Sequence, residues 1–221
     1  MPTYKAQALV LKKTKLGETD AIITMLNQDG AQIKGVAKGA RKPGSRVGAR
    51  LELYSVVDAM LHQGKSLDII TEVRTIDDNS ACRSDVEHSA AAAVVVEMVE
   101  KVTRDSYPEP LLYQMSLEAL RTIGQSTGVA SELIAVACVV KISSVIGYRP
   151  TANEMADSHF EKPEIINWIQ SLLAKRFVEL LQYDQPEYRP ISSELLTFAQ
   201  NWTRDHLEIT LKSLEFIKQL L

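Results

Sequence analysis

The periodicity of the chain changes abruptly at Asp77-Asp78-Asn79-Ser80, and this change constrains the fold more than any other feature of the sequence. Before it, apolar and polar residues alternate in short runs, which is typical of β-strands with one buried face. The four residues at the change are favoured at helix N-caps, and after them the strand pattern stops. We therefore predict an α+β protein, with a β domain at residues 1–78 followed by an all-α helical domain at residues 79–221.

Five strands are predicted in the first 76 residues, at 4–12, 21–27, 31–38, 51–61 and 66–76. Asn27-Gln28-Asp29-Gly30 and Gln63-Gly64-Lys65 are turn sequences that join neighbouring strands. Five strands of this length, without a helical period, are what a small closed barrel such as an OB-fold requires. An SH3-like barrel is the main alternative, so the sequence favours a five-stranded OB-fold β-barrel.

Helices are expected downstream at about 81–105, 109–124, 130–146, 163–183 and 192–219, the last with a break near Ile209-Thr210. Small side chains in the block AAAAVVVEMVE (90–100) would let another helix approach closely, which predicts that the first helix is the central buried one. Gly147 is placed to end the third helix, and Pro163 suits the first turn of the fourth.

The two cysteines and the apolar runs indicate the cellular compartment of the protein. Cys82 and Cys138 both fall in predicted helices and form no C-x-x-C pair, which favours buried free thiols in a reducing compartment. The longest apolar stretch, 90–96, is far shorter than the roughly 20 residues that a membrane span needs, and no signal peptide is recognisable. We therefore expect a cytoplasmic protein that does not bind a membrane.

The net charge of −3 conceals an asymmetry between the two halves of the chain. Residues 1–76 contain 12 Lys/Arg against 7 Asp/Glu, whereas the remainder contains 13 against 21. A basic module followed by an acidic one suggests nucleic acid as the ligand of the first and a protein partner for the second, although an acidic helical surface is often only solubilising.

Basic residues concentrate in KGVAKGARKPGSRVGAR (34–50), and no acidic residue lies between Asp29 and Glu52. The like charges repel one another, which a bound polyanion would relieve, and the glycines let the backbone approach phosphates. A solvated hairpin tip is the plainer interpretation of the same stretch. We predict a nucleic-acid-binding surface with eight basic residues, Lys12, Lys13, Lys34, Lys38, Arg41, Lys42, Arg46 and Arg50.

Catalytic patterns are weak by comparison. GARKPGSR (39–46) has the glycine spacing of a phosphate-binding loop, but Ser45-Arg46 stands where that motif needs Lys followed by Ser or Thr. Cys82 and His88 are six positions apart, and a helix turns too far over that distance for a direct dyad. We predict no catalytic residue, no metal site and no cofactor. Because only Tyr4 and Tyr54 are aromatic in the first 76 residues, we expect binding to depend on backbone charge rather than base stacking.

Four segments resemble the RecO family: LGETDAIITML (16–26), VAKGARKPGSR (36–46), IGYRP (146–150) and HLEITLKSLEFI (206–217). The resemblance implies an N-terminal OB-fold, a C-terminal helical domain and a role as a recombination mediator in DNA repair. It further implies binding of single- and double-stranded DNA, strand annealing, displacement or remodelling of single-strand-binding protein, and loading of the RecA recombinase together with a RecR-type partner.

Two departures from the family pattern matter. Many members carry a four-cysteine zinc site after the GY-x-P segment, whereas residues 148–162 contain no cysteine, so zinc is expected to be absent. Gly44 stands where relatives often have another basic residue, which would weaken DNA binding. Two alternatives stay open: an adaptor whose barrel binds an acidic peptide, and an enzyme that acts on nucleic acid.

Overall fold

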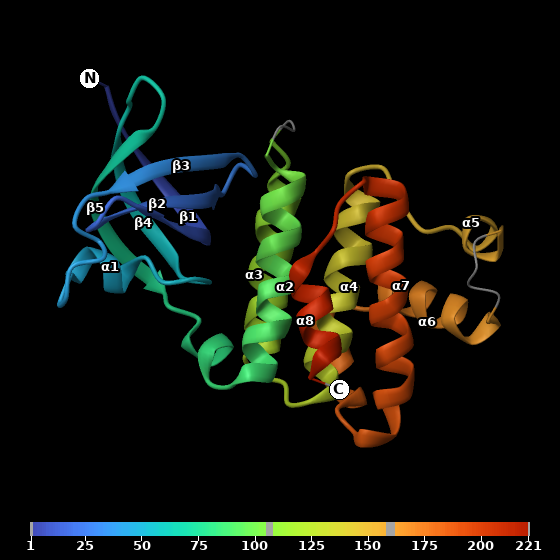
Figure 1. Ribbon diagram of the computed structural model, residues 1–221. Coiled ribbons are helices and arrows are strands. Elements are labelled where there is room, and N and C mark those ends of the chain that lie inside the picture. Colours follow the sequence, from blue (N-terminus) through green and yellow to red (C-terminus); the bar gives the residue numbers. More distant parts are fainter. Residues whose placement is uncertain (1, 105–107, 158–161, 221) are drawn as a thin grey trace. The chain divides into compact units, whose positions relative to one another are not determined.

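The computed structural model of the chain describes residues 2–104, 108–157 and 162–220 (Figure 1). The chain divides into two compact units, one of Met1–Ser80 with Val99–Leu117 and one of Ala81–Met98 with Glu118–Leu221. The first unit is a β-barrel joined by a helical segment, and the second is entirely helical.

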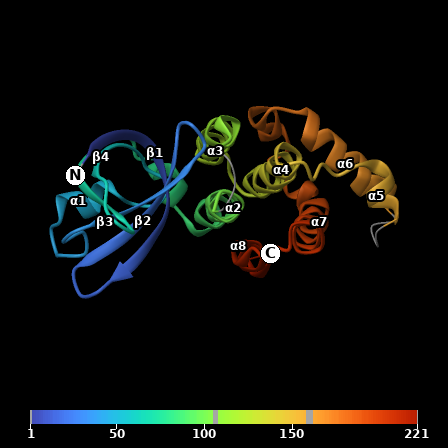
Figure 2. The same ribbon diagram turned by 90° about the horizontal axis from the view of Figure 1, so that it is seen from above.

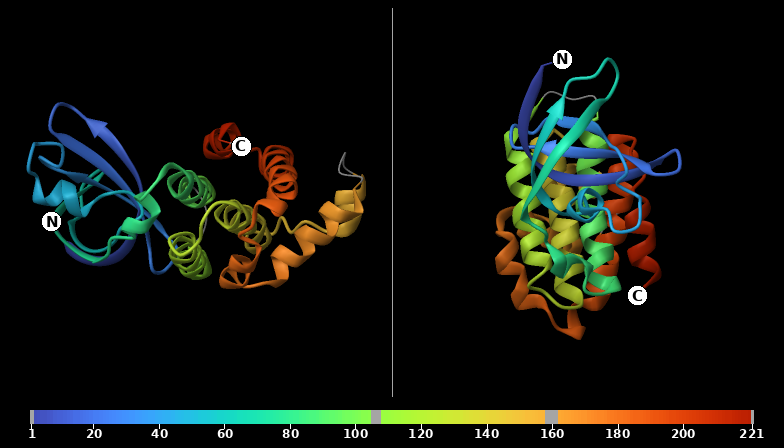
Figure 3. Two further views of the ribbon diagram at one scale, coloured as in Figure 1. Left: turned by 90° about the horizontal axis from the view of Figure 1, so that it is seen from below. Right: turned by 90° about the vertical axis from the view of Figure 1, so that its left-hand side faces the viewer.

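The barrel consists of five strands, β1 (Thr3–Leu16), β2 (Asp20–Asn27), β3 (Gln32–Ala37), β4 (Val56–His62) and β5 (Asp68–Asp77). They close in the order β1-β2-β3-β5-β4. Neighbouring strands are antiparallel except β3 and β5, which pair in parallel. β1 bends, so that its first half pairs with β4 and its second half with β2 (Figure 3). This is the predicted OB-fold barrel, which the structure confirms.

The barrel interior is filled by one face of each strand, as period-two patterning requires. The largest side chains of this core include those of Ile23, Met25, Leu51 and Leu61, which are all completely buried. Gly35 permits β3 to approach β5, because a Cβ atom there would lie only 2.7 Å from Cγ1 of Ile70. This close approach of β3 to β5 explains why a glycine lies within the strand.

The connection between β3 and β4 differs from the prediction in two ways. A short helix, α1 (Arg46–Arg50), lies inside the stretch expected to be a loop, and the Ser45 hydroxyl accepts a hydrogen bond from the Gly48 amide at its start. The strand expected at 51–61 begins only at Val56. The reason is a turn at residues 52–55, in which Tyr54 takes a φ of 74° that no strand residue can adopt.

A helical segment packs on the outer face of the barrel within the first unit. It comprises the end of α2 (Val86–Val102) and the start of α3 (Pro110–Ile123). Nε2 of Gln32 on β3 donates to the carbonyl oxygen of Glu100 at 2.8 Å. Gly30, in the β2–β3 turn, lies so close to Glu109 that a Cβ atom would be 2.1 Å from its carbonyl oxygen. These contacts cover one end of the outer face and leave the other end exposed.

The helical unit contains α4 (Val129–Val145), α5 (Ala152–Asp157), α6 (Pro163–Ala174), α7 (Arg189–Leu207) and α8 (Lys212–Gln219), with short 3₁₀ segments η1 (Ser80–Arg83) before α2 and η2 (Phe177–Tyr183) and η3 (Pro186–Tyr188) before α7. Its centre is α4, which packs against α6, η2 and α7 (Figure 2). Fourteen of the 17 residues of α4 are buried. The prediction that helix 81–105 is the central one is therefore wrong, because α4 is mostly apolar and buried on all sides, as only a surrounded helix can be.

Several predicted helix boundaries are confirmed. Pro163 occupies the first turn of α6, Gly147 follows the end of α4 with a φ of 95°, and the break near Ile209-Thr210 separates α7 from α8. The helix expected at 163–183 instead divides into α6 and η2, and α5 was not expected. Residue 105, the expected end of the first helix, lies outside the described residues.

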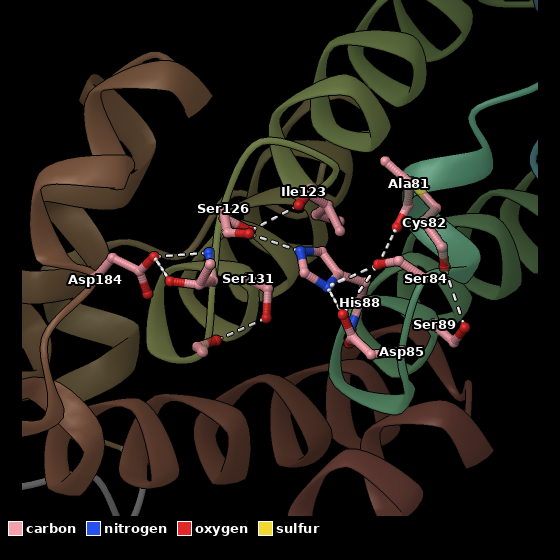
Figure 4. Close-up of polar contacts among 12 residues, drawn as sticks. Ala81, Cys82, Ser84, Asp85, His88, Ser89, Ile123, Ser126, Ser131 and Asp184 are labelled. Atoms are coloured by element: carbon pink, nitrogen blue, oxygen red, sulfur yellow. Dashed lines mark hydrogen bonds and ion pairs between the residues drawn. The ribbon is translucent and has the colours of Figure 1, made fainter.

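Two helices of this unit receive their N-terminal caps from distant carboxylates. Asp184, which is labelled in Figure 4, lies at the start of α4. It accepts hydrogen bonds from the amides of Thr127 at 2.6 Å and Ala130 at 3.1 Å. Glu97 on α2 accepts from the amides of Lys212 at 3.1 Å and Ser213 at 2.8 Å, at the start of α8. Neither Gly128 nor Leu211, the residues at the two N-cap positions, supplies a side-chain cap.

Candidate nucleic-acid interface

The exposed end of the outer β1–β2–β3 face forms a groove of about 410 Å³ within the first unit. Lys12, Thr24 and Lys34 lie side by side on three adjacent strands, because Thr24 pairs with Lys12 on one side and with Lys34 on the other. A bulge in β1 between Val10 and Lys12 sets this register. Two strand spacings, about 10 Å, therefore separate the two lysines across the groove.

The rest of the groove lining comprises Thr14, Ile22, Leu67, Glu100 and Arg104. Leu67 comes from the β4–β5 turn, whereas Glu100 and Arg104 come from the end of α2 and the turn that follows it. Strands β2 and β3 and the β1–β2 and β4–β5 loops are where OB-folds bind oligonucleotides. The groove therefore coincides with the general ligand-binding face of this fold.

A second group of cations, Lys38, Arg41 and Lys42, follows the end of β3. This turn is held against the β1–β2 turn, since Nη1 of Arg41 donates to the carbonyl oxygen of Gly17 at 2.8 Å. The backbone amide of Arg41 also donates to the carbonyl oxygen of Thr19 at 2.8 Å. Arg41 is therefore held in place, because one nitrogen of its guanidinium is anchored on the β1–β2 turn.

Asp20 at the start of β2 fixes the same turn. Its Oδ1 accepts a hydrogen bond from the Gly39 amide at 2.8 Å, and this bond is the largest cause that lowers the pKa of the Asp20 carboxyl. The nearby ammonium groups of Lys38 and Lys42 lower this pKa further. The carboxylate is thus ionised at neutral pH and holds two lysines beside a rigid turn.

Four of the predicted cations are exposed and make no direct polar contact through their side chains in the described structure. Within the parts of the chain that the structure describes, no hydrogen bond or ion pair engages the side chains of Lys34, Lys38, Lys42 and Arg46. Exposed cations whose side chains make no hydrogen bond or ion pair are available to a polyanion, and their mutual repulsion is relieved when one binds.

Lys13 and Arg50 have contacts of a different kind. Nζ of Lys13 donates to Oε1 of Glu52 at 2.7 Å, and Nη1 of Arg50 donates to the carbonyl oxygen of Val73 at 2.9 Å. Arg50 lines a separate hollow of about 800 Å³ in which both signs of charge occur. The structure therefore does not bring these two residues to the groove, and their contacts hold α1 and the turn after it onto the barrel.

Sequence reasoning missed the groove residues that come from outside the basic stretch. Arg104 lies about 70 positions after Lys34, in the half of the chain whose net charge is acidic. No local pattern marks it, because the contact that brings it to Lys12 is tertiary. Ile22 and Leu67, the apolar residues of the groove lining, were predicted as strand residues but not as part of a site.

The helical unit holds its polar side chains in structural contacts. The His88 ring lies between Oδ2 of Asp85, 2.5 Å from Nδ1, and the carbonyl oxygen of Ser126, 2.6 Å from Nε2 (Figure 4). The Cys82 thiol is buried and donates to the carbonyl oxygen of Leu120. Across the described residues, no three His, Cys, Asp or Glu side chains gather as metal ligands. No described helix is both long and apolar enough to cross a bilayer.

A closed five-stranded barrel with basic residues on its β1–β2–β3 face places the first unit in the class of OB-fold proteins. Comparison with known families then assigns the chain: residues 1–79 match the family Recombination protein O N terminal, and residues 83–215 match Recombination protein O C terminal. The chain therefore belongs to the recombination protein O (RecO) family, which confirms the resemblance seen in the sequence.

A curated relative supports this assignment. The DNA repair protein RecO of Cutibacterium acnes is 38% identical over 155 residues, which is 68% of this chain and 63% of the relative. The aligned region thus spans less than two thirds of the relative's length.

Proposed function

We propose that this protein is a non-enzymatic DNA-binding mediator of recombinational repair. It binds single- and double-stranded DNA through the groove and the β3 turn, anneals complementary strands, and helps load recombinase onto DNA coated by single-strand-binding protein. A RecR-type partner and single-strand-binding protein are its direct partners, and the RecA recombinase is an indirect one. The observation that carries this proposal is the group of exposed cations on the ligand-binding face of an OB-fold barrel that belongs to the RecO family.

The chemistry of the groove favours recognition of the DNA backbone. Its lining offers ammonium and guanidinium groups above aliphatic side chains, and the lining residues include no aromatic ring. Phosphates bind such cations whatever the base, whereas stacking platforms would add an affinity that depends on unpaired bases. Binding is therefore tolerant of sequence and extends to duplex DNA.

The proposal assigns no reaction to the protein. Cys82 and His88, the side chains with the most reactive chemistry in the sequence, are held by main-chain carbonyls in the helical unit. Residues 1–78 serve as the DNA-binding module and residues 79–221 as the module for partner proteins, in the cytoplasm.

Reversing two exposed positive charges tests the proposal. Lys34→Glu with Lys42→Glu places acid in the groove and in the β3 turn, and it breaks no hydrogen bond or ion pair seen in the described structure. We expect fluorescence anisotropy to show loss of binding to labelled single strands and duplexes, together with loss of annealing. For the parent protein, about five phosphate contacts would give a slope of log K against log salt of about −4, since each contact contributes roughly −0.7 to −0.9.

The control variant, Arg149→Glu with Lys212→Glu, reverses the same number of exposed charges in the helical unit. It should bind DNA as the parent does. If the Lys34/Lys42 variant keeps its circular dichroism spectrum and still binds DNA with the parent affinity and salt slope, the proposed site is wrong.

A further inference from the structure

One carboxylate stands among the cations of the groove. Oε1 of Glu100 lies 3.4 Å from Nζ of Lys12 and 3.1 Å from Nη2 of Arg104. A single oxygen atom is thus shared by an ammonium group from β1 and a guanidinium group from the turn after α2. Lys34 lines the same groove from β3.

The exposure of the three side chains differs sharply. The Glu100 side chain is only 7% exposed, whereas those of Lys12 and Arg104 are 52% and 50% exposed. Burial works to raise the pKa of the Glu100 carboxyl, but Arg104 and Lys12 outweigh burial and lower it. Glu100 is therefore a fixed anion at neutral pH, and the two cations reach past it into solvent.

An anionic oxygen held between a guanidinium and an ammonium group is also how proteins hold a phosphate oxygen. Each half-exposed cation has donors left after its bond to Glu100, because a guanidinium carries five N–H groups and an ammonium three. A phosphate that enters the groove from solvent can therefore use the same pair of cations.

We propose that the DNA path continues from Lys34 across Lys12 to Arg104, and that Glu100 occupies the position of a phosphate oxygen between the last two cations in the free protein. This inference rests on the proposed function. It adds to that function a binding residue from beyond the barrel, Arg104, and a carboxylate, Glu100, that competes with the phosphate for the same two cations. Glu100 is a positioning residue: it holds Lys12 and Arg104 at one end of the groove and neutralises part of their charge.

The competitor has a defined consequence for binding. A phosphate gains less from Lys12 and Arg104 than from two free cations, because Glu100 repels it and keeps one donor of each engaged. Replacing Glu100 by glutamine preserves its size and an acceptor oxygen but removes the charge. The groove then gains one net positive charge without losing a contact.

The test compares Glu100→Gln, Arg104→Gln and the control Lys101→Gln, which changes the neighbouring cation on a different side of α2. Affinity for a labelled single-stranded oligonucleotide is measured between 50 and about 200 mM salt. We expect Glu100→Gln to bind about fivefold more tightly near 0.1 M salt, with a slope steeper by about 0.7 to 0.9, the share of one phosphate contact. Arg104→Gln should bind about fivefold more weakly with a slope flatter by the same amount, and Lys101→Gln should match the parent.

The double variant Glu100→Gln with Arg104→Gln should gain less than Glu100→Gln alone, since one of the two cations that Glu100 restrains is gone. Arg104 is half exposed, so its variant remains informative even if Glu100→Gln fails to fold. The inference is overturned if Arg104→Gln binds like the parent, or if a folded Glu100→Gln binds no more tightly. If Lys34→Glu with Lys42→Glu still abolishes binding in that case, the proposed function stands and only this extension fails.

Discussion

The Glu97 carboxylate, which caps α8 from another helix, gives the sharpest stability prediction. It accepts hydrogen bonds from the Lys212 amide, the Ser213 amide and the Ser213 hydroxyl, the last two at 2.8 and 2.6 Å. Leu211 at the N-cap position cannot replace it, because its side chain has no acceptor. We expect Glu97→Ala to detach the start of α8.

The size of the effect follows from these contacts. Loss of an N-cap costs about 1 kcal/mol, and loss of a carboxylate near the positive end of a helix costs about 0.3–1 kcal/mol. Ser213 is only 8% exposed, so water cannot fully replace the lost acceptor, and an unsatisfied buried donor adds about 1 kcal/mol or more. We therefore expect a loss of about 2–3 kcal/mol in the free energy of unfolding, with the terms overlapping in part.

Amide hydrogen exchange measures this loss where it occurs. Exchange at Lys212 and Ser213 should accelerate by about 30- to 150-fold in Glu97→Ala, which is the same free energy expressed as a ratio. Glu215→Ala is the matched control, since it removes an exposed carboxylate from the first turn of α8 itself. If exchange at the start of α8 rises no more in Glu97→Ala than in Glu215→Ala, the cap contributes nothing and the reasoning is refuted.

Three further outcomes are expected. Gly30→Ala should destabilise the barrel by more than about 2 kcal/mol in urea unfolding, because its φ is 80° and the added Cβ would meet Glu109. Gly44→Ala, with a φ of 73° in open space, should cost only about 1 kcal/mol. Equal losses in the two variants would contradict this reasoning. Because the pKa of Asp20 is lowered, the stability from its bond to Gly39 is fully present above the unfolded pKa and is lost as pH falls through the folded pKa. The amide resonance of Gly39 should therefore titrate only in that acidic range. A transition near neutral pH would contradict this prediction. Dialysis against a chelator should leave the melting temperature unchanged, and a clear drop would reveal a structural metal.

The fold of the first unit could be read from the sequence because its strands alternate and its turns carry strong signals. The exception is instructive: Leu51 to Ser55 alternates like a strand, yet Tyr54 adopts a left-handed conformation and the chain turns. Local pattern does not reveal a backbone conformation that packing imposes. The central helix was misplaced for a similar reason, since small residues in α2 suggested close packing while α4 is the helix that is buried on every side.

Half of the candidate site was predictable for a physical reason. Lys34, Lys38 and Lys42 are neighbours in sequence, so their shared surface follows from strand geometry and charge density. Arg104 and Glu100 reach the groove only because the end of α2 packs beside β1, and no periodicity encodes that contact. The distant caps of α4 and α8 escaped prediction in the same way, since N-cap rules consider only adjacent residues.

The cap of α4 has a consequence for the order in which the chain is made. Asp184 lies 57 positions after Thr127, and the segments that cover α4, from α6 to α7, are also synthesised later. A nascent chain that ends before residue 163 therefore carries α4 without the Asp184 cap and without α6, η2 and α7, which cover it in the folded protein. Premature termination in this region yields a fragment with exposed core surface and a strong tendency to aggregate, whereas loss of α8 alone leaves α4 capped and covered by α6 and α7.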